Sequence, residues 1–130
     1  MTGANSAGRV GHVRDRATFL ALRRSGRRAR AGQLTLTWLA DVAGDPAPPR
    51  VAYAVGRRIG PAVQRNLVRR RLRAVVAEFV SEMPPGAYLL SVGKAAKTPE
   101  IGEMRTMMAE ALAALGDTSG GRLARDRVRR

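Results

Sequence analysis

The sequence predicts an α/β protein of the α+β type, with three helices and at least three strands. Alternating apolar and polar residues, or short and almost wholly apolar runs, indicate the strands. The strands are expected at residues 33–41, 51–55 and 87–92. Apolar side chains that recur every three or four positions indicate the helices. The helices are expected at residues 15–24, 61–81 and 98–115. A chain of 130 residues is most simply a single domain.

The first helix and the first two strands are marked by their apolar pattern and by the breaks between them. The apolar positions of the helix are Phe19, Leu20 and Leu22. Ser25-Gly26 ends this helix. The inner face of the next strand consists of Leu34, Leu36, Trp38 and Ala40. A loop rich in glycine and proline follows at residues 44–49, so the strand at 51–55 is most simply antiparallel to the one before it.

Proline and glycine also mark the remaining elements. Gly60-Pro61 opens the long helix, since proline is tolerated in the first turn, and residues 83–86 (Met-Pro-Pro-Gly) stop it. The strand at 87–92 is nearly all apolar and is therefore expected at the centre of the sheet. The last helix begins at Thr98-Pro99-Glu100, with Thr98 as its capping residue, and Gly116 is its expected end.

We expect both ends of the chain to be disordered. Residues 1–8 are small and polar, and residues 117–130 form a small, polar and basic tail. Residues 9–116 remain as one folded domain. The absence of cysteine excludes disulfides and thiolate metal sites. No apolar run approaches ~20 residues and the start lacks an apolar signal core, so we expect a soluble, cytoplasmic protein.

Positive charge is the strongest feature of the chain. Its 24 Lys and Arg residues outnumber its 10 Asp and Glu residues, which gives a formal net charge of +14. From Arg50 to Arg73 there are eight arginines and no acid. A second basic cluster lies at residues 23–30. Such density produces a field that a polyanion neutralises, so nucleic acid is the expected partner and an anionic membrane a weaker one.

The spacing of the arginines places them on one side of the long helix. At about 100° per residue, five polar side chains fall within one arc of roughly 140°. These are Arg65, Asn66, Arg69, Arg70 and Arg73. The opposite side is apolar and can anchor the helix, with Arg71 as the one irregular position on it. Like charges at i,i+4 destabilise a helix slightly, so the pattern favours polyanion binding over a merely solvated face.

No set of side chains suited to bond chemistry is visible. His12 is the only histidine and lies beside the expected disordered end. Without cysteine, or paired carboxylates near the basic helix, nucleophilic and two-metal mechanisms lack their groups. No catalytic residue and no protein-bound metal is therefore expected. Two aromatic side chains near basic residues, Phe19 and Tyr53, fit either core packing or stacking on unpaired bases.

These residues resemble one known family. The run Arg65-Asn66-x-x-Arg69-Arg70-x-x-Arg73 is similar to the Arg-Asn-x-x-Lys-Arg-x-x-Arg signature of the protein subunit of bacterial ribonuclease P. Residues 50–63 resemble the strand and basic turn that precede the signature in that family. Phe19 followed by Gly26, and residues 87–94, fit as well. The resemblance covers roughly residues 9–115.

The resemblance implies a two-layer α/β sandwich with a four-stranded mixed sheet and three helices, in the order α-β-β-β-α-β-α. The strand that composition alone does not indicate falls near residues 28–31. The parallel strand–helix–strand crossover of the family is left-handed, against the usual right-handed rule.

The resemblance also implies a function, in which residues 9–116 form an RNA-binding domain. A large RNA subunit with bound Mg²⁺ removes the 5′ leader of precursor tRNA, and the protein is its non-catalytic cofactor. The implied contacts to the catalytic RNA are Arg57, Arg58, Arg65, Asn66, Arg69, Arg70 and Arg73. A cleft between the first helix and the sheet guides the single-stranded leader, and its implied residues are Phe19, Tyr53 and Lys94. The expected partners are the catalytic RNA and precursor tRNA, with no membrane and no obligate protein partner.

Several positions depart from the family pattern. Arg69 stands in place of the signature lysine, and Ala74 in place of an acid that often follows the signature. Arg23 and Thr37 occupy positions where aromatic residues are common. We therefore expect contact with the leader to depend more on cations than on stacking.

Composition alone also fits other functions. A structural RNA-binding protein of the ribosome is the main alternative, and the RNA that co-purifies with the protein separates the two. A nucleoid protein with its long helix in the major groove, and a helix on a membrane surface, are further alternatives.

Overall fold

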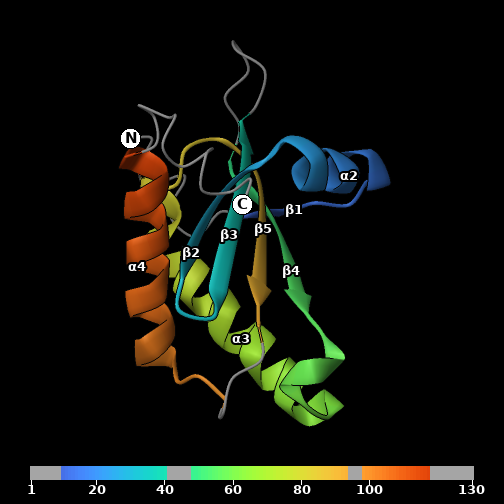
Figure 1. Cartoon of the computed structure of the whole chain (residues 1–130), viewed down its shortest axis with the longest axis vertical. Coiled ribbons are helices and arrows are strands. Elements are labelled where there is room, and N and C mark those ends of the chain that lie inside the picture. Colours follow the sequence, from blue (N-terminus) through green and yellow to red (C-terminus); the bar gives the residue numbers. More distant parts are fainter. Residues whose placement is uncertain (1–9, 41–47, 94–97, 118–130) are drawn as a thin grey trace.

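The computed structural model describes residues 10–40, 48–93 and 98–117. Two helices, α3 and α4, cover one face of a five-stranded sheet, and α2 lies on the other face (Figure 1). The elements are β1 (Gly11–His12), α2 (Arg16–Ser25), β2 (Arg27–Ala31), β3 (Leu34–Ala40), β4 (Arg50–Val55), η1 (Arg57–Ile59), α3 (Ala62–Phe79), η2 (Val80–Glu82), β5 (Gly86–Val92) and α4 (Ile101–Asp117). The expected disorder of residues 1–8 and 118–130 falls outside the described residues, whereas Asp117 is the last residue of α4.

The strand order across the sheet is β1-β4-β5-β3-β2. β5 is central, as its apolar composition predicts. β5 pairs antiparallel with β3 and parallel with β4, so the sheet is mixed. The simplest expectation, that β4 would follow β3 as its antiparallel neighbour, is wrong because β5 lies between them. The expectation of four strands is corrected to five, since β1 pairs with the start of β4 through only two residues, Gly11 and His12.

The crossover from β4 through α3 to β5 has the unusual hand. In Figure 1 β4 and β5 both point downwards, β5 lies to the left of β4, and α3 passes behind them. This is a left-handed connection, as the family resemblance implies and contrary to the general preference.

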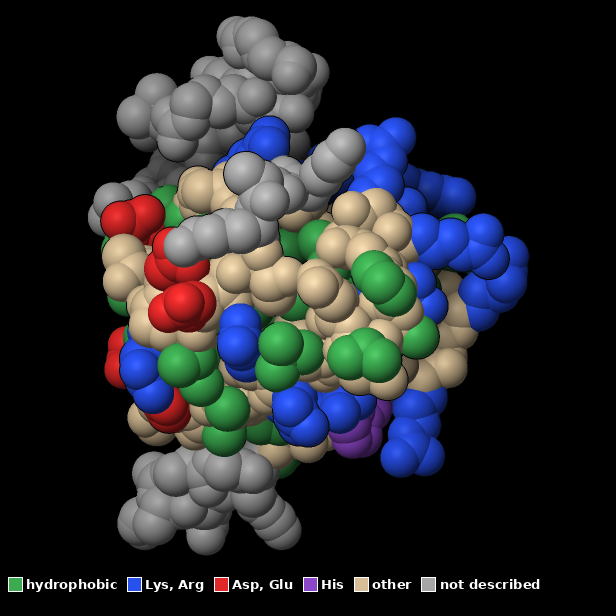
Figure 2. Space-filling view, turned by 90° about the horizontal axis from the view of Figure 1, so that it is seen from below, with side chains coloured by type: hydrophobic (Ala, Val, Ile, Leu, Met, Phe, Trp, Pro, Cys, Tyr) green, Lys and Arg blue, Asp and Glu red, His purple; other side chains and the backbone are tan. Residues whose placement is uncertain are grey.

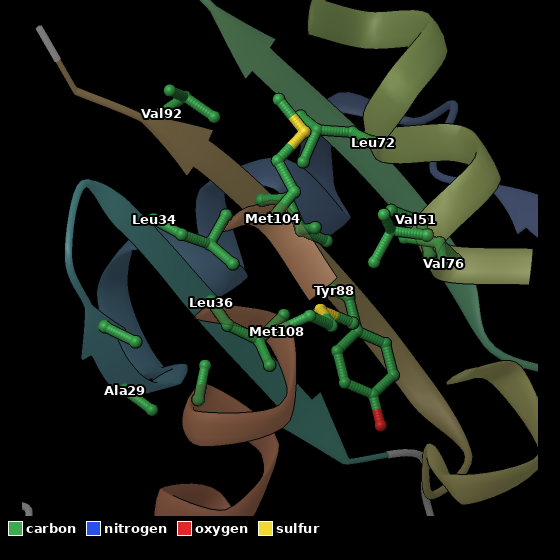
Figure 3. Close-up of a cluster of buried hydrophobic side chains, with 14 of the residues drawn as sticks. Ala29, Leu34, Leu36, Val51, Leu72, Val76, Tyr88, Val92, Met104 and Met108 are labelled. Carbon is green, nitrogen blue, oxygen red and sulfur yellow. The ribbon is translucent and has the colours of Figure 1, made fainter. Parts of the chain in front are cut away.

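The main core lies between the sheet and helices α3 and α4. Side chains of β3, β4 and β5 point toward the methionines of α4 and the aliphatic side chains of α3 (Figure 3). Its fully buried members include Leu34, Leu36, Val51, Leu72, Val76, Tyr88, Leu90, Met104 and Met108. Trp38 shares this face, as its place in the alternating strand predicts, and its ring stacks on Tyr88 with centroids 6.3 Å apart.

A smaller core lies under α2 on the other face of the sheet. Its buried members are Leu22, Ala52, Ala87 and Leu89, and Phe19 packs against them. Asp15 caps α2, because its carboxylate accepts hydrogen bonds from the backbone N–H and the hydroxyl of Thr18. These hydrogen bonds lower the pKa of Asp15. A Cβ at Gly26 would lie 2.5 Å from Cγ2 of Thr37, so only glycine lets the chain leave α2 this close to β3.

The start of α4 differs from its expected form. The helix begins at Ile101, and the Thr98 hydroxyl donates to Gln64 Oε1 on α3 (2.7 Å) instead of capping the helix. At this end of the helix the Glu103 side chain provides a hydrogen-bond acceptor, because its Oε1 accepts from the backbone N–H of Glu100 (2.8 Å). Arg71, the irregular position on α3, donates from Nη1 to the carbonyl of Pro99 (2.6 Å). It therefore fixes the start of α4 to α3.

Candidate nucleic-acid interface

Helix α3 is anchored on one side and leaves its basic side exposed. Val68, Leu72, Val75 and Val76 are buried in the main core. On the opposite side Asn66, Arg70 and Arg73 are exposed, and Arg65 and Arg69 are half-buried. We refer to these five polar residues as the α3 basic face. The structure therefore brings all five together, as their helical spacing predicts.

The members of the α3 basic face are held in different ways. Arg69 Nη1 donates to the Asn66 side-chain oxygen (3.0 Å), so the amide orients a guanidinium on the same face. Arg65 Nη1 donates to the backbone carbonyl of Gly60 (3.1 Å), which points this side chain back toward the preceding turn. The guanidinium carbon of Arg73 lies 5.6 Å from the centre of the Tyr53 ring.

The turn before α3 places two more cations beside the face. Arg57 and Arg58 are exposed in η1. The chain then turns sharply at Gly60, whose φ of 142° lies in the region that only glycine adopts easily. The hydrogen bond from Arg65 to Gly60 ties this turn to the first part of α3. The seven residues expected to contact the catalytic RNA thus lie on one continuous stretch, η1 with α3.

Two of the three residues expected in a leader cleft lie on opposite faces of the sheet. Phe19 packs in the small core under α2, whereas Tyr53 points to the α3 face of the sheet and borders the main core. Lys94 lies outside the described residues. Successive side chains of a strand alternate between faces, so Tyr53 follows Val51 and Val55 rather than Ala52 and Ala54. Burial raises the pKa of the Tyr53 hydroxyl to about 12, although the Arg73 charge opposes this shift.

The α2 side of the sheet carries functional candidates that sequence reasoning missed. The register aligns small and polar side chains in one row across four strands beyond α2. The row consists of Arg30, Thr35, Ser91 and Ala54. Arg30 is exposed and the other three are half-buried, so this part of the sheet is accessible. The alternation of Thr35 and Thr37 with buried leucines could have indicated this polar side of β3. The strand pairing that aligns it with Arg30, Ser91 and Ala54 could not be predicted from the sequence.

Charge is distributed unevenly over the molecule. In Figure 2 the acidic side chains gather at the left edge, the side on which Figure 1 places α4, and most cations lie on the right and toward the bottom. Glu100, Glu103 and Glu110 are exposed, as expected of a solvated helix face. Arg105 Nε lies 2.8 Å from Glu78 Oε1 and forms an ion pair between α4 and α3. Its hydrogen bonds lower the pKa of Glu78 and raise the pKa of Arg105.

Among the described residues no cluster of three or more His, Asp or Glu side chains could hold a metal ion. His12 is exposed on the edge strand β1. In the same part of the chain, no helix is long and apolar enough to cross a membrane.

The fold and this surface define a class: a small α/β protein that presents arginines from one rigid helix to a polyanion. Comparison with known families then identifies the chain. The model of the Ribonuclease P family matches residues 9–116. The chain belongs to this family of ribonuclease P protein components, the non-catalytic subunits of the ribonuclease that processes the 5′ end of tRNA. The family favours this function over the ribosomal, nucleoid and membrane-surface functions that composition left open.

Individual relatives agree with the family assignment. The chain is 38% identical over 82 residues to the ribonuclease P protein component of Clavibacter michiganensis. The matched region covers 63% of this chain and 71% of that protein. It is 45% identical over 83 residues to the corresponding protein of Micrococcus luteus, with 56% and 59% covered. Among solved structures, the RNase P protein of Staphylococcus aureus has a TM-score of 0.70 at 17% identity, with 80% of this chain and 94% of that chain covered. That likeness supports the fold.

Proposed function

We propose that the α3 basic face, together with Arg57 and Arg58, is the surface by which this chain binds the catalytic RNA of ribonuclease P. The observation that carries the proposal is that these cations line η1 and one side of α3, four of them exposed and Arg65 and Arg69 half-buried, while the other side of α3 is anchored in the main core. Arginine suits this role because its planar guanidinium forms paired hydrogen bonds to phosphate and stays charged. Asn66 adds a neutral amide that can donate to or accept from a sugar hydroxyl or a base edge.

We further propose that the 5′ leader of precursor tRNA lies on the α2 side of the sheet. The row from Arg30 to Ala54 offers small side chains that let a single strand approach the backbone, with Arg28 and Arg30 at one end as phosphate partners. Phe19 is half-buried at this side, so part of its ring remains for contact with a base. Thr37 stands where an aromatic residue is common in the family; it has no ring and is only 3% exposed. Stacking on leader bases therefore depends on Phe19, and most of the affinity for the leader depends on cations.

Mg²⁺ enters this function through the RNA. The exposed arginines of η1 and α3 support a protein that contributes positive charge, with Mg²⁺ bound by the RNA subunit. Cations on the protein replace part of the ionic requirement for bringing two RNAs together. We place this ribonucleoprotein in the cytoplasm, with the catalytic RNA and precursor tRNA as its partners.

Reconstitution at low Mg²⁺ tests the function as a whole. The catalytic RNA encoded in the same genome is incubated with precursor tRNA at an Mg²⁺ concentration at which the RNA alone is nearly inactive. Added protein is expected to restore cleavage at the 5′ end, and the protein without RNA is expected to cleave nothing. Cleavage that stays unchanged on addition of the protein would contradict the proposal.

Substitution tests the interface. Arg69→Ala with Arg70→Ala removes two cations from the α3 basic face, and we expect affinity for the catalytic RNA to fall by about 10- to 100-fold at physiological salt. Arg105→Ala is the matched control, since this arginine lies on α4 and is paired with Glu78. Its effect on RNA affinity should be less than about twofold. A loss of affinity in Arg105→Ala that is half as large, on a logarithmic scale, as the loss in the double variant would mean that only net charge matters.

A further inference from the structure

The side chain of Tyr53 is placed to act on Arg73 rather than on the leader. Tyr53 belongs to β4, where it faces α3 and borders the main core. The Arg73 guanidinium lies over its ring at 5.6 Å, a distance typical of cation–π contacts. The contact joins the sheet to the last arginine of the α3 basic face.

The sheet gives Tyr53 a fixed position. Tyr53 pairs in register with Leu90 of the central strand β5, and the ring is partly buried among core side chains. A phenol is neutral at physiological pH, and burial raises the pKa of the Tyr53 hydroxyl further, to about 12. A neutral ring held by the sheet is a rigid platform for a cation.

Arg73 itself is exposed, and no acid among the described residues forms an ion pair with it. A free arginine side chain samples many rotamers, and binding RNA would have to restrict them. Stacking on a ring uses only the flat face of the guanidinium. The N–H groups lie in its plane and remain directed outward, where they can donate to a phosphate.

We propose that Tyr53 is a positioning residue for RNA binding, which holds the Arg73 guanidinium on the α3 basic face in the conformation that contacts the RNA backbone. This proposal rests on the proposed function of that face. It also assigns Tyr53 to the side of the protein that binds the catalytic RNA, in place of the leader cleft.

A double-mutant cycle tests the coupling. The affinity of the full chain for the catalytic RNA of the same genome is measured for Tyr53→Leu, Arg73→Gln and the double variant. Tyr53→Leu should weaken binding by about two- to fivefold, because the ring contact and its ordering of Arg73 are lost. In the Arg73→Gln background the same change should have no further effect. In the Arg70→Gln background, where the arginine removed does not touch the ring, the full loss should remain.

Rescue and salt dependence separate positioning from a general structural role. Tyr53→Phe keeps the ring face and should bind within about twofold of the wild type. The dependence of log K on log salt should become shallower by ~0.7–0.9 in Arg73→Gln, the contribution of one phosphate contact. Tyr53→Leu should change the slope in the same direction, and adding it to Arg73→Gln should change nothing more.

Two results would overturn the proposal. One is an equal effect of Tyr53→Leu in the Arg73→Gln and Arg70→Gln backgrounds; the other is a Tyr53→Phe variant as weak as Tyr53→Leu. Thermal unfolding shows whether each variant is folded at the assay temperature, and if Tyr53→Leu is not, Tyr53→Met takes its place in the cycle. Failure of the interface itself would show separately, as unchanged affinity of Arg69→Ala with Arg70→Ala.

Discussion

Arginines that are neighbours in the sequence have different roles in this protein. In the run Arg69-Arg70-Arg71, the first is oriented by Asn66, the second is exposed, and the third donates to the carbonyl of Pro99. Helix geometry turns each successive side chain by about 100°, so three adjacent guanidinium groups point in three directions. Charge counted along the sequence therefore overstates the number of cations that RNA can reach.

Arg71→Ala is expected to lower stability without a matching loss of RNA affinity. The variant removes a partly buried charged hydrogen bond between α3 and the start of α4, at a cost of about 1.5–3 kcal/mol in the free energy of unfolding. Urea unfolding followed by circular dichroism measures this change. Arg70→Ala should show the reverse, with weaker RNA binding and nearly unchanged stability. A loss of RNA affinity in folded Arg71→Ala as large as that of Arg70→Ala would contradict this division of roles.

The sequence predicts the α3 basic face well but not every contact within it. Periodicity identifies the exposed residues because a helix anchored by Val68, Leu72 and Val75 can show only its other side to solvent. The bond from Arg65 to Gly60 depends on the sharp turn before the helix, which periodicity does not describe. The sequence also could not predict which face of the sheet Tyr53 occupies, because both sides of β4 are apolar and no polar side marks its orientation.

At the scale of elements, α2 is attached to the sheet through a small core. Leu22 of α2 is fully buried against Ala52, Ala87 and Leu89 of the sheet, and Phe19 of the same helix packs against this core. Leu22 and Phe19 therefore supply much of the apolar area that holds the helix, and the surface proposed for the leader depends on that helix.

Leu22→Ala is expected to destabilise the protein by about 2–5 kcal/mol, because truncating a fully buried leucine leaves a cavity under α2. Leu20→Ala is the control on the same helix, since Leu20 is 46% exposed and its truncation should cost less than ~0.5 kcal/mol. Urea unfolding measures both. Similar small effects from the two changes would show that α2 is not held by this core.

The ion pair between α3 and α4 makes a pH-dependent contribution. The pKa of Glu78 is lower in the folded protein than its ordinary value of 4.5, chiefly because its carboxylate accepts hydrogen bonds from Arg105. The stabilisation is thus present above pH 4.5 and is lost as the pH falls through the lower folded pKa. Glu78→Gln should reduce the melting temperature slightly at pH 7, and the difference from the wild type should shrink below pH 4.5. A difference that stays constant from pH 7 to pH 3 would show that the pair contributes no charge-dependent stability.

Strand existence could be predicted from local patterns, but strand pairing could not. The runs at β3, β4 and β5 each show apolar alternation or continuity, which burial imposes on a strand. The insertion of β5 between β3 and β4 is set by the long crossover through α3, which no local pattern encodes. β1 has only two residues, too few to show a period.

For the whole molecule, opposite charges on opposite sides should orient binding as well as strengthen it. Acidic side chains gather at one edge of the molecule, the side of α4, and most cations lie away from that edge (Figures 1 and 2). A phosphate backbone approaching α4 meets like charge, which disfavours docking in the wrong orientation. The net charge of +14 alone would attract any polyanion from any side.

Neutralising the acids of α4 is therefore expected to reduce discrimination between nucleic acids. Glu100→Gln, at the residue just before α4, with Glu110→Gln within the helix raises the formal net charge from +14 to +16. At low salt, affinity for duplex DNA should rise by about two- to tenfold, because α4 then no longer repels phosphates. Affinity for the catalytic RNA should change less, since its main contacts are on α3. Ala109→Gln with Ala113→Gln adds the same side chains to the same helix without a charge change and should leave both affinities unaltered. At about 1 M salt, where the screening length is ~3 Å, the variants should converge. An equal rise in affinity for RNA and DNA would mean that the acids of α4 reduce net charge but do not direct binding.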